Sequence, residues 1–335
     1  MWVDLCHAET GRGHIAHNVP CQDKTYSITA NGTSVIALSD GAGSAKLSHF
    51  GAEKVTEQIC QYLSVNFDRI FNNENGAEVK KEIIGIIIES IECLAKELEC
   101  EKRDLACTLL MAAVKDNRYI LFHCGDGAIG FLQGEELKVA TKPDNGEYAN
   151  ETFFVTSHDS IGHLRIAKGT LDGIIAFVLM SDGSESCLYN KREGFFANAV
   201  RKMINSLTFS PIETIRKNIA DAFHNTVIKK TNDDCSIALL VKRDSETSYY
   251  KTLSFEEKCD LLKINRKATN LAVVVRKTEK LLHIMQQPKT MLEIYKENRD
   301  RCIFYRFYIK QKIMDLMKKS LVKKDGDYYQ SVICI

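Results

Sequence analysis

The sequence lacks the long apolar runs of membrane-spanning chains. None of its stretches approaches the roughly 18 consecutive apolar residues that a transmembrane helix needs. The first residues, Met1 to His14, have neither the basic start nor the apolar centre of a signal peptide. The 12 cysteines include no Cys-x-x-Cys pair, so we expect neither a zinc site nor a disulfide framework. Together these absences predict a cytoplasmic protein that does not bind a membrane.

Several sequence signatures of catalysis are also missing. The chain has no Gly-x-Ser-x-Gly elbow, which excludes the serine nucleophile of the α/β-hydrolases. It has no Gly-x₄-Gly-Lys-[Ser/Thr] loop, which excludes the P-loop nucleotide-binding proteins. Any chemistry that this chain performs must therefore come from another arrangement of residues.

Acidic residues stand at the ends of several short apolar segments. Asp40 and Asp182 each lie in a Ser-Asp-Gly sequence after an apolar run, and Asp126-Gly127 ends a third run. Asp233 and Asp234 directly precede an apolar segment, and Asp23 precedes a strand-like one. A single Asp-Gly is most simply a turn, because this dipeptide is common in turns. Repetition at strand ends instead predicts carboxylates that meet at one edge of a sheet or sandwich.

Such carboxylates would repel one another unless a cation neutralised them. Mg²⁺ and Mn²⁺ prefer oxygen ligands from carboxylates, carbonyls and water, so the pattern predicts a site for one of these ions. Gly41 and Gly43 fit this interpretation, because a residue without a side chain lets a backbone or a ligand approach closely.

The spacing of apolar residues predicts both strands and helices. Strands are expected in short β-branched or apolar segments, at 24–39, 107–114, 118–124, 127–132, 174–181 and 235–241. Helical periodicity covers 45–66, 77–98 and 210–230, the last with Ser210 as N-cap and Pro211 at the first helical position. Because the helices come mostly in pairs and do not follow every strand, we expect an α+β fold. Two antiparallel sheets would be covered by helices in four α-β-β-α layers.

Charge divides the chain near residue 250. Residues 1–250 contain 26 Lys and Arg against 34 Asp and Glu, a net charge of −8, whereas residues 251–335 contain 19 against 10, a net charge of +9. We predict one domain at 1–250 and a basic, mainly helical appendage at 251–335. The appendage must bury its apolar side chains, and we expect this within the protein or through a homodimer. The apolar side chains are Leu261, Leu262, Ile264, Leu281, Leu282, Ile284, Ile303, Phe304, Phe307 and Ile313. The alternative is that the basic face of the appendage attracts a protein partner or an acidic phosphosubstrate.

The order of the acidic motifs over about residues 10–242 resembles the metal-dependent type 2C Ser/Thr protein phosphatases (the PPM family), in particular their bacterial branch. The matching segments are GRGHIAHNVPCQD, VIALSDGAGSAKLSHFGA, ACTLLMAAV, FHCGDGAIGF, NGEYANETFFVTS, FVLMSDGSES and NDDCSIALLV.

The resemblance implies roles for individual residues. Asp40 would bridge two metal ions and Gly41 would give one of them its backbone carbonyl, while Asp182 and Asp233 would be direct ligands of the other ion. Asp126 would belong to a third, weaker site. The implied metal ligands are Asp23, Asp40, Gly41, Asp126, Asp182 and Asp233, and the implied catalytic residues are Asp40, Asp182, Asp233 and His14.

Three positions depart from the family pattern. Gln22 stands where the family usually has Glu, Asn18 where it has a phosphate-binding Arg, and Asp234 where it has Asn. Arg12, His14 and His17 are the candidates to replace that Arg, although a histidine in such a loop is often only a surface or capping residue. Asp234→Asn restores the usual family residue, so we expect a mild effect. Thr108 matches a position beside the site, to which we assign no chemistry.

The resemblance implies hydrolysis of phosphoserine and phosphothreonine esters by a water that bridges two ions of Mn²⁺ or Mg²⁺. The alternative is a phosphatase-like binding module with weak or no turnover, which the altered Glu and Arg positions would explain. The expected partner is a phosphoprotein, with a cognate Ser/Thr kinase or its target as an option. Nucleic acid is not expected, because the basic residues of 251–335 alternate with apolar ones at helical spacing.

Overall fold

The computed structural model describes residues 1–144, 152–244, 246, 248–298 and 303–335. Contacts divide the chain into two compact units, which we describe separately. The larger unit comprises Trp2–Ile204 and Arg216–Val241, and the smaller comprises Met1, Asn205–Ile215 and Lys242–Ile335. No helix in the described part of the chain is long and apolar enough to cross a membrane. The division into domains at 1–250 and 251–335 is a statement about which segments fold independently, and it stays a prediction.

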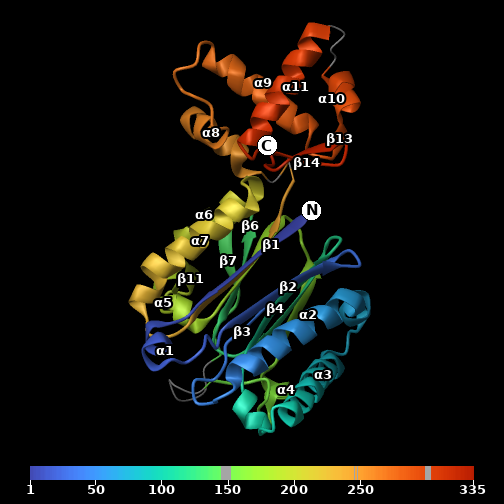
Figure 1. Ribbon diagram of the computed structural model, residues 1–335. Coiled ribbons are helices and arrows are strands. Elements are labelled where there is room, and N and C mark those ends of the chain that lie inside the picture. The colour runs from blue at the N-terminus through green and yellow to red at the C-terminus, as the bar shows by residue number, and fades with distance from the viewer. Residues whose placement is uncertain (145–151, 245, 247, 299–302) are drawn as a thin grey trace. The chain divides into compact units, whose positions relative to one another are not determined.

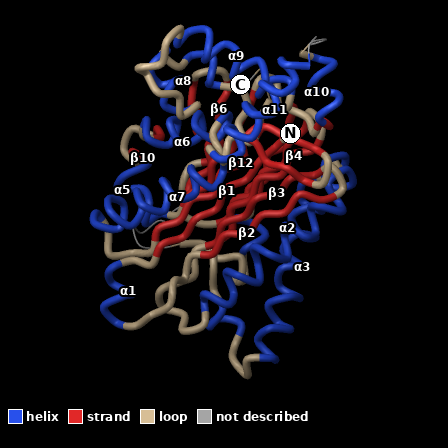
Figure 2. The backbone as a smooth tube through the Cα atoms, turned by 45° about the horizontal axis from the view of Figure 1, so that its top comes forward, coloured by secondary structure: helices blue, strands red, loops and turns tan. Residues whose placement is uncertain are grey.

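Two five-stranded sheets form the centre of the larger unit (Figures 1 and 2). One has the order β2-β3-β4-β5-β8 and is antiparallel throughout. The other has the order β1-β12-β9-β6-β7, with β12, β9, β6 and β7 antiparallel. The strands are β1 (Trp2–Glu9), β2 (Lys24–Ala30), β3 (Thr33–Ser39), β4 (Leu109–Lys115), β5 (Arg118–Cys124), β6 (Ala128–Gln133), β7 (Glu136–Thr141), β8 (Arg165–Thr170), β9 (Ile174–Met180) and β12 (Cys235–Lys242).

Helices cover the outer faces of these sheets. Figure 1 shows α2 and α3 on one side and α6 and α7 on the other. The two sheets and their helices confirm the predicted α-β-β-α sandwich. The helices and short elements are α1 (Arg12–His17), α2 (Ser48–Asn72), α3 (Gly76–Glu97), α4 (Ser160–His163), α5 (Glu185–Leu188), β10 (Tyr189–Asn190), β11 (Phe195–Phe196), α6 (Asn198–Phe209) and α7 (Ile212–Ala222).

The apolar runs of the central strands reflect burial on both faces. In β3, Val35 and Ala37 pack in the core that includes α2 and α3, whereas Ile36 and Leu38 pack in the core that includes residues of the second sheet. Successive side chains of a strand point to opposite faces, so a strand between two apolar layers needs apolar residues at every position. This is why the strand sequence runs without polar interruption up to Ser39.

Two predicted elements differ from the structure. The segment 24–39 is a hairpin and not one strand, because Asn31 and Gly32 form a turn with positive φ angles of 53° and 74°. Asn-Gly is the preferred pair for such a turn, since both residues tolerate positive φ. The helix predicted at 210–230 is α7, which ends at Ala222 and continues as a π-helical turn over Phe223–Val227.

The smaller unit contains helices and a small sheet around its own apolar core. The sheet was not predicted, because its strands are only two to four residues long and carry polar side chains. Its order is β13-β15-β14, and both pairs are antiparallel. The elements are α8 (Phe255–Leu261), α9 (Leu271–Ile284), β13 (Lys289–Thr290), α10 (Met291–Glu297), α11 (Ile303–Lys318), β14 (Val322–Asp325) and β15 (Tyr328–Ser331).

Candidate metal centre

Three carboxylates from separate strand ends meet in the larger unit. Asp40 follows β3, Asp126 lies between β5 and β6, and Asp182 follows β9. Each offers one oxygen atom, and these three atoms all lie within 4.8 Å of one another. We refer to these three residues as the acidic cluster. The charges of Asp23 and Asp233 also act on Asp40, so all five predicted aspartates face a common region.

The pKa values of these carboxyl groups reflect burial among like charges. Burial, followed by the neighbouring carboxylates, raises the pKa of Asp40 well above its usual value. Burial also raises the pKa of Asp182 to about 6 and that of Asp23 to about 7. Asp182 Oδ1 and Asp23 Oδ1 are buried and have no hydrogen-bond partner among the described residues. Buried carboxylate oxygens that repel one another and lack donors fit a hard divalent cation.

Thr108 holds the backbone of Asp40 in place. The Asp40 amide donates to Thr108 Oγ1 at 2.9 Å, and the Thr108 amide donates to the Asp40 carbonyl at 2.9 Å. The hydroxyl of Ser39 donates to the Thr108 carbonyl at 2.6 Å. Thr108 therefore positions an acidic residue 68 places away in the chain, a role that the sequence did not indicate.

Hydroxyl groups support two further aspartates. Ser181 Oγ donates to Asp23 Oδ2 at 2.7 Å and accepts from the Ser236 amide at 3.0 Å. Thr152 Oγ1 donates to Asp126 Oδ2. Part of the segment NGEYANETFFVTS, at 145–151, lies outside the described residues.

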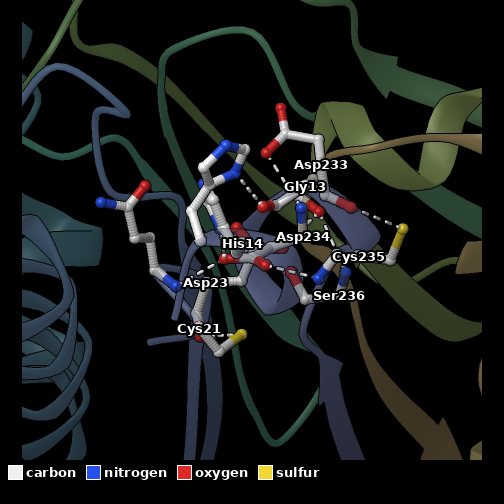
Figure 3. A network of polar contacts seen from close by, with 12 residues as sticks. Gly13, His14, Cys21, Asp23, Asp233, Asp234, Cys235 and Ser236 are labelled. Carbon is white, nitrogen blue, oxygen red and sulfur yellow. Dashed lines mark hydrogen bonds and ion pairs between the residues drawn. The ribbon is translucent and has the colours of Figure 1, made fainter. Parts of the chain in front are cut away.

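Asp234 has a different environment from its neighbour Asp233 (Figure 3). Its carboxylate is buried and accepts from the amides of Gly11 at 2.7 Å and Gln22 at 2.6 Å. Its Oδ2 also lies 2.9 Å from His14 Nδ1. Asp233 is exposed to solvent. An Asn at 234 would offer one oxygen where the site presents three partners, so we expect Asp234→Asn to lower stability. The mild effect expected on activity stays a prediction.

Two of the three residues considered as replacements for the phosphate-binding Arg line a cavity of about 500 Å³ beside Asp233. His14 and His17 line it, and His17 Nδ1 is 2.8 Å from the Gly13 carbonyl. Arg12 Nε instead donates to the Thr231 carbonyl at 3.1 Å. Asn18, at the position of the usual Arg, is the C-cap of α1 with a φ of 55°, a left-handed conformation that Asn tolerates well.

A second cavity, of about 600 Å³, lies beside Asp182. Glu185 lines it, and burial raises the pKa of this carboxyl group to about 7. Glu185 Oε1 is another buried oxygen without a partner among the described residues. The sequence analysis missed Glu185, although it stands three residues after Asp182 in SDGSES.

Cys6 and Arg12 have the Cys-x₅-Arg spacing of phosphatases that use a cysteine nucleophile. Cys6 lies within strand β1 and not in a loop. Burial, with a contribution from Asp4, raises the pKa of its thiol to about 12. A thiol that keeps its proton at neutral pH is a poor nucleophile, so this pair does not form such a site.

Close backbone contact makes Gly183 intolerant of a side chain. A Cβ atom at Gly183 would lie 1.9 Å from the Asp234 carbonyl oxygen, whereas one at Gly43 would meet only Gln22 Oε1 at 4.0 Å. We expect Gly183→Ala to lower the free energy of unfolding by about 1–3 kcal/mol, because the backbone must shift. Gly43→Ala is the matched control and should stay within about 0.5 kcal/mol of the unmodified protein in urea unfolding. Equal stability of both variants would contradict this packing.

The stabilisation that Mn²⁺ gives should depend on pH. The folded-state pKa values of Asp23 and Asp182, about 7 and about 6, lie above the unfolded value of 3.8. Without metal, and at pH values between the unfolded and the folded pKa, the folded chain therefore binds more protons than the unfolded chain. The protons bound by Asp23 and Asp182 stabilise the folded state at low pH, and this stabilisation is lost as the pH rises toward 7. A cation binds the deprotonated carboxylates, so the increase in Tm on adding Mn²⁺ should grow from pH 5 to pH 7 and then level off. An increase that is constant with pH would contradict the assignment.

Comparisons with known proteins agree with this arrangement. A family model for protein phosphatase 2C matches residues 10–224. Serine/threonine-protein phosphatase 3 of Escherichia coli (strain K12) is 25% identical over 254 residues, which are 70% of this chain and 96% of that protein.

Two solved structures are similar in fold. A bacterial serine phosphatase has a TM-score of 0.53 at 13% identity, covering 73% of this chain and 99% of its own. The serine/threonine phosphatase Stp1 from Staphylococcus aureus has a TM-score of 0.52 at 14% identity, covering 72% of this chain and 95% of its own. The family model matches more than half of the chain, and the matched range includes four of the five converging aspartates, so the chain belongs to the protein phosphatase 2C family.

Proposed function

We propose that this protein hydrolyses phosphoserine and phosphothreonine esters on proteins and that it needs Mn²⁺ or Mg²⁺ to do so. The observation that carries the proposal is the acidic cluster, whose three carboxylate oxygens lie within 4.8 Å of one another. The raised pKa values of Asp40 and Asp182 indicate that these carboxylates hold their protons because no positive charge lies nearby. Such carboxylates are suited to exchange their protons for a cation. The relatives named above support the choice of substrate.

Asp40 and Asp182 would hold the ions, together with Asp233 and the Gly41 carbonyl. Asp23 would act through water, and Asp126 would serve a third, weaker site. When bound, two divalent ions would supply a bridging water with a lowered pKa and would offset charge on the phosphoryl oxygens. The chain's own contribution is positional, because Thr108 and Ser181 fix the orientation of Asp40 and Asp23 by hydrogen bonds.

His14 is our candidate for contact with the substrate phosphate. Nδ1 of its ring lies 2.9 Å from Asp234 Oδ2, which leaves Nε2 available to donate to an anion in the adjoining cavity. We expect His14→Ala to raise KM for p-nitrophenyl phosphate about 10-fold, the loss of one charge-assisted hydrogen bond. His17→Ala, whose ring contacts the Gly13 carbonyl, is the control and should leave KM nearly unchanged. Unchanged kinetics in both variants would assign phosphate contact to the metal ions.

The alternative function is a phosphatase-like regulatory module that binds phosphoproteins with weak or no turnover. Steady-state hydrolysis of p-nitrophenyl phosphate and of a phosphothreonine peptide in Mn²⁺, abolished by EDTA, would establish the enzyme. Binding of the phosphopeptide without turnover in Mn²⁺ or Mg²⁺ would establish the module. Undiminished turnover in EDTA would contradict the metal-dependent mechanism.

A phosphoprotein substrate, with a cognate kinase or its target as partner, remains part of the proposal, as does a homodimer through the C-terminal helices. We also propose a cytoplasmic location. Free thiols support it, because none of the described cysteines forms a disulfide, as expected in a reducing compartment.

A further inference from the structure

The smaller unit has a distinctive order of elements. After α9 come the short strand β13, the helices α10 and α11 in succession, and the hairpin of β14 and β15. β15 lies between β13 and β14, so the hairpin extends a small sheet that starts before the two helices (Figure 1). Two consecutive helices followed by a β-hairpin form a winged helix-turn-helix arrangement. In helix-turn-helix proteins the second helix of the pair contacts nucleic-acid bases.

The second helix, α11, has one buried and one exposed face. Ile309, Ile313 and Leu316 are completely buried in the core of the smaller unit. On the opposite face Phe307 is 65% exposed and Met314 is 45% exposed. Exposed polar side chains alternate with these two apolar ones, and they are Arg306, Lys310, Gln311 and Lys318.

The positive charge lies on α11, whereas the hairpin itself is neutral, with two Lys and two Asp at 322–331. Residues 303–331 contain seven Lys and Arg (306, 310, 312, 318, 319, 323 and 324) against three Asp (315, 325 and 327), a net charge of +4. Asp315 is already paired with Lys312 and Lys319, at 3.9 Å and 2.9 Å. In the part of the chain that the structure describes, Arg306 and Lys310 form no ion pair with a carboxylate.

The hairpin presents two adjacent lysines at an exposed edge. Lys323 and Lys324 of β14 are exposed, and Lys324 Nζ lies 5.5 Å from the centre of the Tyr329 ring. The turn between the strands contains Gly326 with a φ of 55°, and Tyr328 beside it is 51% exposed. The acidic residues of this hairpin are Asp325 and Asp327, which flank the turn.

We propose that the smaller unit binds double-stranded DNA, with α11 in the major groove and the hairpin of β14 and β15 against the phosphate backbone. A helix of 16 residues is about 24 Å long and fits a groove about 12 Å wide. Arg and Lys bond guanine, Gln bonds adenine, and apolar side chains contact the thymine methyl group, so the exposed face of α11 has side chains suited to base edges. This reverses the expectation from charge spacing alone that nucleic acid is not a partner.

Fluorescence anisotropy of the full-length protein with a labelled 24-base-pair DNA duplex of mixed sequence tests the proposal. On the exposed face of α11, Phe307, Gln311, Met314 and Lys318 lie at the centre and face the bases, whereas Arg306 and Lys310 lie on the flank and face the phosphates. If Arg306, Lys310, Lys323 and Lys324 each neutralise one phosphate, the logarithm of affinity should fall with that of salt at a slope of about −3.6. This corresponds to an about 150-fold loss of affinity between 50 and 200 mM NaCl. The double variant Lys323→Glu/Lys324→Glu and the single variant Lys310→Glu should weaken binding at least about 8-fold per phosphate contact at 100 mM NaCl.

Lys267→Glu is the matched control. It makes the same charge change at an exposed lysine of the loop between α8 and α9, and it should bind as the unmodified protein does. Circular dichroism melting curves establish that the variants fold. An RNA duplex should compete poorly, because its major groove does not admit side chains. The proposal is overturned if no duplex DNA binds at 50 mM NaCl, if folded Lys310→Glu and Lys323→Glu/Lys324→Glu bind normally, or if polyglutamate displaces the DNA at equal charge.

Discussion

Asp40→Asn is expected to lower kcat/KM for p-nitrophenyl phosphate by about 10³-fold in Mn²⁺. The carboxylate of Asp40 is the one that the charges of four other aspartates act upon, so it is the best placed to share a cation. Metal-ion catalysis contributes several kcal/mol to transition-state stabilisation, and each 1.36 kcal/mol is about tenfold in rate. Steady-state kinetics over a range of Mn²⁺ concentrations provide the measurement, and Asp182→Asn and Asp233→Asn should follow closely.

A second measurement separates loss of the metal site from misfolding. Without metal, Asp40→Asn should be more stable than the unmodified protein, because one of several repelling carboxylates has been removed. The same variant should lose most of the increase in Tm that Mn²⁺ gives the unmodified protein. Asp116→Asn, the same change at an exposed hairpin residue, should leave activity and the Mn²⁺ effect unchanged. An Asp40→Asn protein that keeps its activity and its Mn²⁺-dependent increase in Tm would refute the assignment of Asp40 as a metal ligand.

Asp234→Ala is expected to lower the free energy of unfolding by about 3–5 kcal/mol, measured by urea unfolding in Mn²⁺. This change leaves the buried amides of Gly11 and Gln22 without their acceptor and removes the carboxylate that pairs with the ring of His14. Asp234→Asn should lower the free energy of unfolding by about 1–3 kcal/mol. The NH₂ group of the Asn side chain would face one of the groups that now donate to Asp234, and two donors cannot form a hydrogen bond.

The adjacent position provides the contrast for Asp234. Asp233 is exposed, so in the absence of metal Asp233→Asn should keep the stability of the unmodified protein. Its activity in Mn²⁺ should nevertheless fall, because Asp233 is a proposed metal ligand. An Asp234→Asn variant as stable as the unmodified protein would mean that the three contacts of Asp234 contribute little. Loss of activity in Asp234→Asn but not in Asp233→Asn would shift the predicted metal ligand by one residue.

The sequence alone determined the features that depend on local patterns. Apolar runs gave most central strands, and helical periodicity gave α2 and α3 to within a few residues, because burial of one face requires that spacing. Aspartates at strand ends indicated a common acidic site, since strand ends of a sheet converge. The Asn31-Gly32 hairpin was also readable from sequence through its turn residues, although it was not predicted.

Only the tertiary structure decided which residues support the site. Asp234 contacts amides more than 200 residues away in the chain, and Thr108 positions Asp40 across 68 residues. Contacts between residues so far apart produce no periodic pattern in the sequence. A Thr or an Asp also appears in the sequence in the same way whether its side chain is exposed or buried. The small sheet of the second unit was likewise hidden, because strands of two to four residues are too short to show alternation and are defined by their pairing partners.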